Sequence, residues 1–242
     1  MNREILILSL RQLLGKRRTL ALVALALLPL LVALVFRAGN ADTDPVDWTA
    51  NTLLNGLIVT TVLPLVTLVL ATTSLGMEIE DGTIVYLLSK PLSRAHVVTS
   101  KLAASWLPAA ALVSLSAAAS SSIALQGSGY DVLPAFVIAL ALGALAYCAV
   151  FLLLSLLTTR ALVVGLIYVF IWEGLVTELF EGTRILSVRQ YTLGVADLLT
   201  DVRAFDADLD GVGALVLMAL VTAIVVALTI RRLNRFETRT LF

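Results

Sequence analysis

Six long apolar runs, separated by short polar stretches, dominate the pattern of hydrophobic and polar positions along the chain. Each run has about 20 residues, the length that an α-helix needs to cross the hydrocarbon core of a bilayer. The runs cover approximately residues 19–36, 53–75, 102–125, 133–157, 161–180 and 212–230. The pattern therefore predicts an all-α integral membrane protein with six transmembrane helices in a single domain, residues 1–242.

The residues ahead of the first run show a weaker helical pattern. Four leucines between Leu6 and Leu14 recur at helical spacing, whereas Glu4 and Arg11 lie elsewhere on the helical wheel. This pattern predicts an N-terminal interfacial helix over residues 1–15, lying in the membrane surface. The alternative is that these residues extend the first span into the cytoplasm.

The third run is rich in alanine and serine. Small residues let two helices approach closely in a membrane, so we expect this run to be packed inside the protein. The serines are Ser105, Ser114, Ser116, Ser120, Ser121 and Ser122.

The connection between the fifth and sixth runs is about 30 residues long, which is more than a simple hairpin needs. Within it, four apolar residues recur at helical spacing while Asp197 and Asp201 fall on another face. The apolar residues are Val195, Leu198, Leu199 and Val202. We therefore predict a short amphipathic helix, and the sequence alone allows it to lie flat on the membrane surface.

A charged segment, residues 77–101, separates the second and third runs. Asp81 can cap a helix beginning near Gly82, and Pro91 disfavours helical geometry at the residue before it. The apolar members of this predicted helix are Ile84, Val85, Leu87 and Leu88, with Tyr86 among them. Ser93 can cap a second helix that runs through Arg94 and Lys101 into the third run. A short helix across the mouth of two membrane helices is expected.

The distribution of basic residues predicts the orientation. With the N-terminus in the cytoplasm, only four of the 17 Lys and Arg residues fall outside: Arg37, Arg184, Arg189 and Arg203. Basic residues collect on the cytoplasmic side of membrane proteins. We therefore predict a multi-pass protein of the plasma membrane with both termini in the cytoplasm.

Composition supports the membrane class and excludes most enzymes. Hydrophobic residues make up 60% of the chain and charged residues 14%, with a mean hydropathy of +1.00. A net charge of zero gives no reason to expect nucleic acid as a partner. One histidine and one cysteine, His96 and Cys148, cannot assemble most catalytic or metal sites, and phosphate-loop or nucleophile-elbow motifs are missing. We therefore expect no catalytic residue in this chain.

Glu173 is the acidic residue that stands out within an apolar run. An ionised carboxylate inside a membrane is costly, so such a residue is a functional candidate. The alternative is that Glu173 reaches the outer interface, as its neighbour Trp172 suggests.

The charged segment resembles a known family. The order Glu78, Gly82-Thr83, Leu87-Leu88-Ser89, Pro91, Ser93-Arg94 and Lys101 is similar to the pattern after the second transmembrane helix of ABC-2 type transporter permeases. In that family the segment is a coupling helix that docks on a separate ATP-binding subunit. The resemblance implies an ATPase-coupling interface made of Glu78, Glu80, Asp81, Gly82, Thr83, Tyr86, Leu87, Leu88, Pro91 and Arg94. It also implies a re-entrant helical hairpin between the fifth and sixth spans.

The resemblance further implies the membrane subunit of an ATP-driven ABC transporter, an exporter working as a homodimer with two ATPase chains. ATP and Mg would be bound by the ATPase partner, and this chain would hold no cofactor. Two other classes stay open from the residues alone. One is a stand-alone ion- or proton-coupled transporter that uses Glu173, and the other is a membrane anchor or scaffold subunit.

Overall fold

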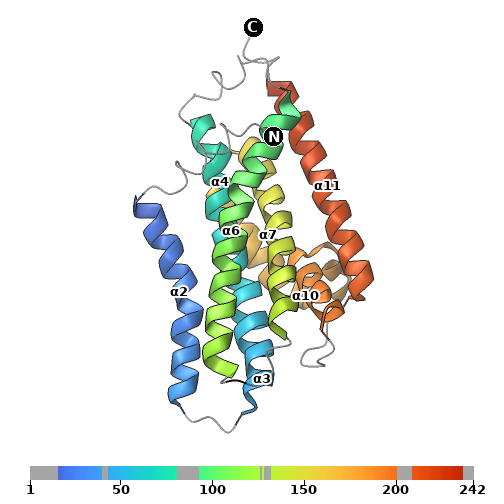
Figure 1. The fold of residues 1–242 in the computed structure, drawn as a ribbon. Coiled ribbons are helices and arrows are strands. Elements are labelled where there is room, and N and C mark those ends of the chain that lie inside the picture. The colour runs from blue at the N-terminus through green and yellow to red at the C-terminus, as the bar shows by residue number, and fades with distance from the viewer. Residues whose placement is uncertain are drawn as a thin grey trace.

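A computed structural model describes residues 16–39, 43–80, 93–125, 127, 132–200 and 209–236. The predicted interfacial helix over residues 1–15 lies outside the described residues. So does most of the predicted coupling helix, because residues 81–92 are not described. Every regular element in the described part of the chain is a helix (Figure 1).

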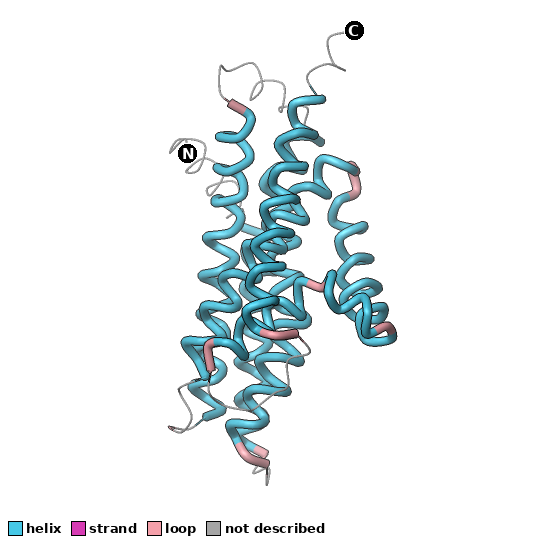
Figure 2. The backbone as a smooth tube through the Cα atoms, turned by 90° about the vertical axis from the view of Figure 1, so that its right-hand side faces the viewer, coloured by secondary structure: helices cyan, strands magenta, loops and turns pink. Residues whose placement is uncertain are grey.

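The helices of the described residues range from 3 to 32 residues in length. In chain order they are α2 (Lys16–Ala38), α3 (Pro45–Trp48), η1 (Thr49–Val62), α4 (Leu63–Glu80), α6 (Arg94–Leu125), α7 (Val132–Leu157), α8 (Ala161–Ile167), η2 (Tyr168–Val176), α9 (Thr177–Leu179), η3 (Glu181–Leu186), α10 (Val188–Leu198) and α11 (Gly211–Phe236). Two of them, η1 and η2, are π-helical, and η3 is a 3₁₀-helix. Figure 2 shows the long helices running side by side, with loops mainly at their ends.

Five helical segments of the described chain are long and apolar enough to cross a membrane: Leu20–Ala38, Pro45–Gly76, Arg94–Leu125, Val132–Leu157 and Gly211–Asn234. They coincide with five of the six predicted spans. The predicted fifth span, residues 161–180, forms a shorter apolar helix, Ala161–Val176. Its crossing of the membrane, and with it the six-span topology, stays a prediction.

The bundle is built around α7, which packs against α4, α6, α10 and α11. The outermost helices are α2 and α11, on opposite sides of the ribbon in Figure 1. Only 22% of the apolar window of α2 and 17% of that of α11 are buried, against 61% for the segment Pro45–Gly76. Large apolar side chains of α2 and α11 therefore face outward, as they would toward lipid.

The serine-rich helix α6 is interior on one side only. Ser105, Ser116, Ser120 and Ser121 are buried, whereas Leu115 on the same helix is exposed. The Ser116 hydroxyl donates to the Ala26 carbonyl oxygen of α2 at 2.6 Å, which joins the two helices. The expected close packing is therefore confirmed for the serine face, but the helix as a whole is not enclosed.

The start of α6 agrees with its predicted cap. The helix begins at Arg94, and the His96 N–H donates to the Ser93 Oγ atom at 3.4 Å. From there α6 continues through Lys101 to Leu125 without interruption. The start of α2, the end of α4, the start of α6 and the end of α11 lie at the same end of the bundle (Figure 1).

Candidate functional site

The predicted ATPase-coupling interface is described only at its two edges. Glu78 and Glu80 belong to the last turn of α4, and Arg94 is the first residue of α6. The other predicted members lie outside the described residues: Asp81, Gly82, Thr83, Tyr86, Leu87, Leu88 and Pro91. Docking of this segment on a partner therefore stays a prediction.

The two helices that flank this segment are joined by a buried apolar cluster, here called the root cluster. It consists of Leu75, Val97, Val98, Leu152, Leu156 and Leu233. These residues come from α4, α6, α7 and α11, so four helices meet directly beside residues 78–94. Close-packed apolar clusters resist deformation, and the ends of α4 and α6 are therefore held in fixed relation to each other.

Lys101, the last residue of the family pattern, lies at the same junction and is buried. Its side chain is 1% exposed. Its carbonyl oxygen accepts from the Ser74 hydroxyl at 3.2 Å and from the Ser105 hydroxyl at 3.1 Å. The first of these bonds links α4 to α6. The signal in the sequence was the spacing of Val97, Lys101 and Ser105, which puts Lys101 on the buried face of the helix.

The second candidate site surrounds Glu173 in η2, whose side chain is 3% exposed. Its Oε1 atom accepts from the Tyr168 hydroxyl at 2.9 Å and from the Val188 N–H at 3.0 Å. Its Oε2 atom accepts from the Ser187 hydroxyl at 2.5 Å. Both carboxylate oxygens are thus hydrogen-bonded within the protein interior, as a buried acidic group requires.

The π-helical winding of η2 brings Tyr168 and Glu173 together. Residues five apart lie about 140° apart around an α-helix, which has 3.6 residues per turn. In a π-helix the wider turn carries backbone bonds from i to i+5, so residues five apart lie closer to one face than they do in an α-helix. The Thr177 N–H accordingly donates to the Trp172 carbonyl oxygen. An ordinary α-helix would separate the phenol from the carboxylate.

Glu173 also completes the N-terminal cap of α10. The Ser187 Oγ atom accepts from the Gln190 N–H at 3.2 Å and donates to Glu173. The carboxylate accepts directly from the Val188 N–H, the first of the helix. Free N–H groups and the positive end of the helix dipole both favour a negative charge at this position. A side chain 15 residues earlier in the chain therefore caps α10.

The connection between η2 and α10 is folded back on η2. The Arg184 Nε–H donates to the Thr177 carbonyl oxygen at 3.3 Å, and the Thr183 hydroxyl donates to the Val176 carbonyl oxygen at 3.2 Å. The Tyr191 hydroxyl of α10 donates to the Ile185 carbonyl oxygen. Burial, and next the nearby Glu173 carboxylate, raise the pKa of Tyr191 above 10.0, which keeps this phenol a donor.

The connection between the fifth and sixth runs contains a helix, but of the four predicted apolar residues it includes only Val195, which is buried, and Leu198, which is exposed. The helix is α10, Val188–Leu198, and its core-facing residues include Val188, Tyr191, Thr192 and Val195. These lie at positions i, i+3, i+4 and i+7 of one helical face. Leu198 and Leu199, predicted on the apolar side, are each 45% exposed. Val202 lies outside the described residues.

Two glycine contacts hold α10 between α7 and α11. A Cβ atom at Gly143 of α7 would lie 2.4 Å from the Thr192 Oγ1 atom. A Cβ atom at Gly194 of α10 would lie 2.6 Å from the Ala214 Cβ atom of α11. Such distances leave no room for a side chain at either glycine, so the Thr192 side chain packs directly against the Gly143 backbone and the Ala214 methyl group against the Gly194 backbone.

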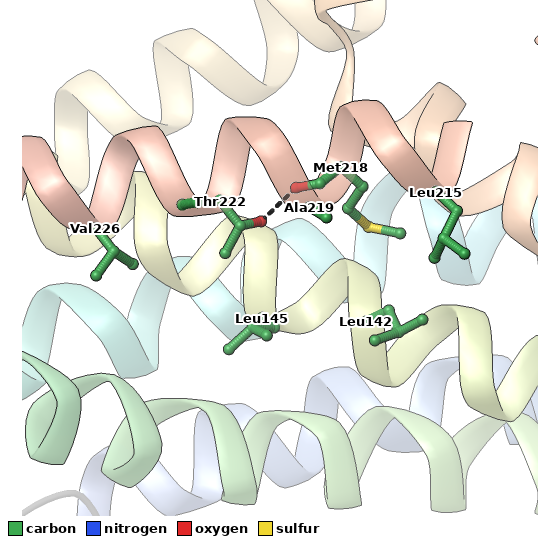
Figure 3. A pocket seen from close by; sticks show the side chains of 8 residues that line it. Leu142, Leu145, Leu215, Met218, Ala219, Thr222 and Val226 are labelled. Carbon is green, nitrogen blue, oxygen red and sulfur yellow. Dashed lines mark hydrogen bonds between the residues drawn. The ribbon is translucent and has the colours of Figure 1, made fainter. Parts of the chain in front are cut away.

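An apolar groove of about 370 Å³ runs between α7 and α11 (Figure 3). It is lined by Leu142, Leu145, Leu215, Met218, Ala219, Thr222, Ala223 and Val226. The Thr222 hydroxyl donates to the Met218 carbonyl oxygen of its own helix at 2.7 Å. The groove therefore offers apolar contacts, which suit a hydrocarbon chain rather than a polar solute.

Long apolar helices with outward-facing leucine and valine, packed around a helical core, define a multi-pass integral membrane protein. A sequence model of one family, described as "ABC-2 family transporter protein", matches residues 15–177, about two thirds of the 242-residue chain. The chain belongs to this ABC-2 transporter family. Among curated proteins, no match to this chain was found.

The family match confirms the resemblance carried by the charged segment. It covers the chain from the residue before α2 to the first residue of α9, and so includes Glu173 and the predicted coupling segment. As a member of the family, the chain is a permease subunit of an ABC transporter, a membrane transport subunit that is not itself the catalytic one. Membership also implies an ATP-binding partner.

Proposed function

We propose that this chain forms the membrane-spanning path of an ATP-driven exporter, as a homodimer bound to two separately encoded ATPase chains. ATP and Mg would be bound and used on the ATPase chains. Both termini, and the segment between α4 and α6, would face the cytoplasm. The orientation rests on the predominance of basic residues on that side.

The coupling step is proposed to run through residues 78–94. The observation that carries it is the root cluster, because Leu75 of α4 and Val97 of α6 pack in one group directly beside this segment. A displacement of the segment by the ATPase would be passed to both helices together. Rigid-body movement of packed helices is a common way to open and close a path.

Inside that segment, the predicted helix would place Leu87 and Leu88 in a pocket of the ATPase. Buried apolar anchors supply most of the affinity of an interface, whereas charged residues at its rim mainly tune the rate of association. Glu78, Glu80 and Asp81 are proposed as rim residues that meet basic groups of the partner. The fifth helical run, residues 161–180, is proposed to cross the membrane.

The test is co-purification of the ATPase with the double variant Leu87→Asp, Leu88→Asp. We expect at least a tenfold loss of bound ATPase at unchanged membrane insertion, since two charges would have to be buried in the pocket. The matched control is Ala95→Asp, which adds a negative charge at an exposed position in the first turn of α6. Undiminished ATPase binding by the double variant would refute the docking role.

A further inference from the structure

Glu173 joins two separate parts of the chain. Of its three donors, Tyr168 belongs to the same helix, whereas Ser187 and Val188 lie 14 and 15 residues further along. These last two are the cap and the first residue of α10. The carboxylate therefore bridges η2 and α10.

The bridge consists of two hydrogen bonds in the protein interior, one of 2.5 Å from the Ser187 hydroxyl and one of 3.0 Å from the Val188 N–H. Without the carboxylate, the Val188 N–H and the Ser187 hydroxyl would lose a partner in a buried site, since Ser187 is 0% exposed. The start of α10 thus depends on η2.

The rest of α10 is fixed to other helices. The Thr192 side chain lies against the Gly143 backbone of α7, and the Ala214 methyl group of α11 lies against the Gly194 backbone, with no room for a Cβ atom at either glycine. Tyr168 of η2 contacts Phe151 of α7 edge to face at 6.1 Å between ring centroids, which links η2 to α7. The short helix α10 therefore lies between the fifth helical run and the last long helix of the bundle.

We propose that Glu173 is a positioning residue that ties α10 to η2, so that movement of the fifth helical run during transport is passed through α10 to α11. The inference rests on the proposed function, because the movement is driven by the partner ATPase. Glu173 need not touch a transported solute for this role. Its carboxylate acts by keeping Ser187 and Val188 beside η2.

The experiment is amide hydrogen exchange on the full transporter in lipid nanodiscs, comparing the nucleotide-free complex with one held by ATP, Mg and orthovanadate. In the wild type, the amide exchange of η2 and that of α10 should both differ between these two states. In Glu173→Ala, the amides of Val188–Tyr191 should exchange about tenfold faster or more. In that variant, the amide exchange of α10 should no longer differ between the two nucleotide states. The exchange at the ends of α4 and α6 should still differ.

Two variants are matched controls. Tyr168→Phe removes the donor on η2 but keeps both bonds to α10, so the response of α10 should persist. Asp210→Ala removes the cap bond from the Gly213 N–H, 3.2 Å long, at the start of α11, and should leave α10 protected. If the amides of α10 exchange faster in either control, the loss of any nearby hydrogen bond has the same effect as the loss of Glu173. That result would overturn the specific role of Glu173.

Outcomes separate this inference from the proposed function. If the amide exchange of α10 in Glu173→Ala differs between the two nucleotide states as it does in the wild type, the positioning role is wrong. ATP-driven movement of the permease is not contradicted by that result. If the amide exchange of α4 and α6 in the wild type is the same in both nucleotide states, the proposed function is wrong, and so is the inference that rests on it. If Glu173→Ala does not insert, Glu173→Leu, which also lacks an acceptor for the Ser187 and Val188 donors, replaces it, and unchanged exchange and unchanged response in that variant overturn the role.

Discussion

The contact between α10 and α11 allows a sharp test with the variant Gly194→Ala. The added Cβ atom would lie 2.6 Å from the Ala214 Cβ atom and 3.3 Å from the Leu209 carbonyl oxygen. Carbon atoms in van der Waals contact are about 3.5–4.0 Å apart, so the helices would have to separate by roughly 1 Å. Neither atom can rotate away, because the Ala214 Cβ atom is bonded directly to the backbone and the Leu209 carbonyl oxygen is a backbone atom.

Overpacking of this kind costs about 1–3 kcal/mol. For a chain of this size, 1 kcal/mol corresponds to roughly 2–4 °C in the melting temperature. We therefore expect Gly194→Ala to melt about 2–12 °C below the wild type in detergent micelles, measured by the fluorescence of the tryptophans. The control is Gly182→Ala, because a Cβ atom at Gly182 meets nothing within 4 Å.

A double-mutant cycle identifies the contact that is responsible. Ala214→Gly removes the opposing Cβ atom and by itself costs about 1 kcal/mol as a glycine in a helix. Added to Gly194→Ala, it should recover at least about 1 kcal/mol relative to the sum of the single variants, since the clash is gone. Strictly additive effects would contradict the close approach of α10 and α11.

Two further predictions concern single hydrogen bonds. Glu173→Gln should retain ATP-dependent transport within about threefold of the wild type, because the amide oxygen still accepts a bond; complete loss of transport in a stably inserted variant would favour an ion-coupling role for Glu173. Ser116→Ala should lower the free energy of unfolding by about 0.5–1.5 kcal/mol, because the 2.6 Å bond to Ala26 joins α6 to α2. Ser122→Ala is its control in thermal unfolding, since that hydroxyl bonds to Ala118 of its own helix, and an equal loss there would contradict the assignment.

The positions of the long helices could be predicted because an apolar run of membrane length needs only composition to be recognised. The predicted fourth span, 133–157, differs by one residue from α7, Val132–Leu157. Hydropathy misses helical turns that continue beyond the apolar run. For this reason α6 begins at Arg94 rather than near residue 102, although the Ser93 cap had predicted a helix there.

The surroundings of Glu173 could not be predicted, because they depend on winding and on contacts between distant residues. A π-helix has no compositional signature, so the pairing of Tyr168 with Glu173 was not visible in the sequence. The buried face of α10 was readable, since Val188, Tyr191 and Val195 have helical spacing after Ser187. The prediction instead grouped Val195 with Leu198, Leu199 and Val202, and of these Val195 is buried whereas Leu198 and Leu199 are exposed.

The single cysteine has a practical consequence for all of these measurements. Cys148 lies on α7 among the core residues and is 0% exposed. A thiol without access to solvent does not react with polar maleimide or nitroxide reagents. Spin labels or fluorophores can therefore be attached to introduced surface cysteines, for example at the exposed position Ala95 beside the coupling segment, without first altering the native chain.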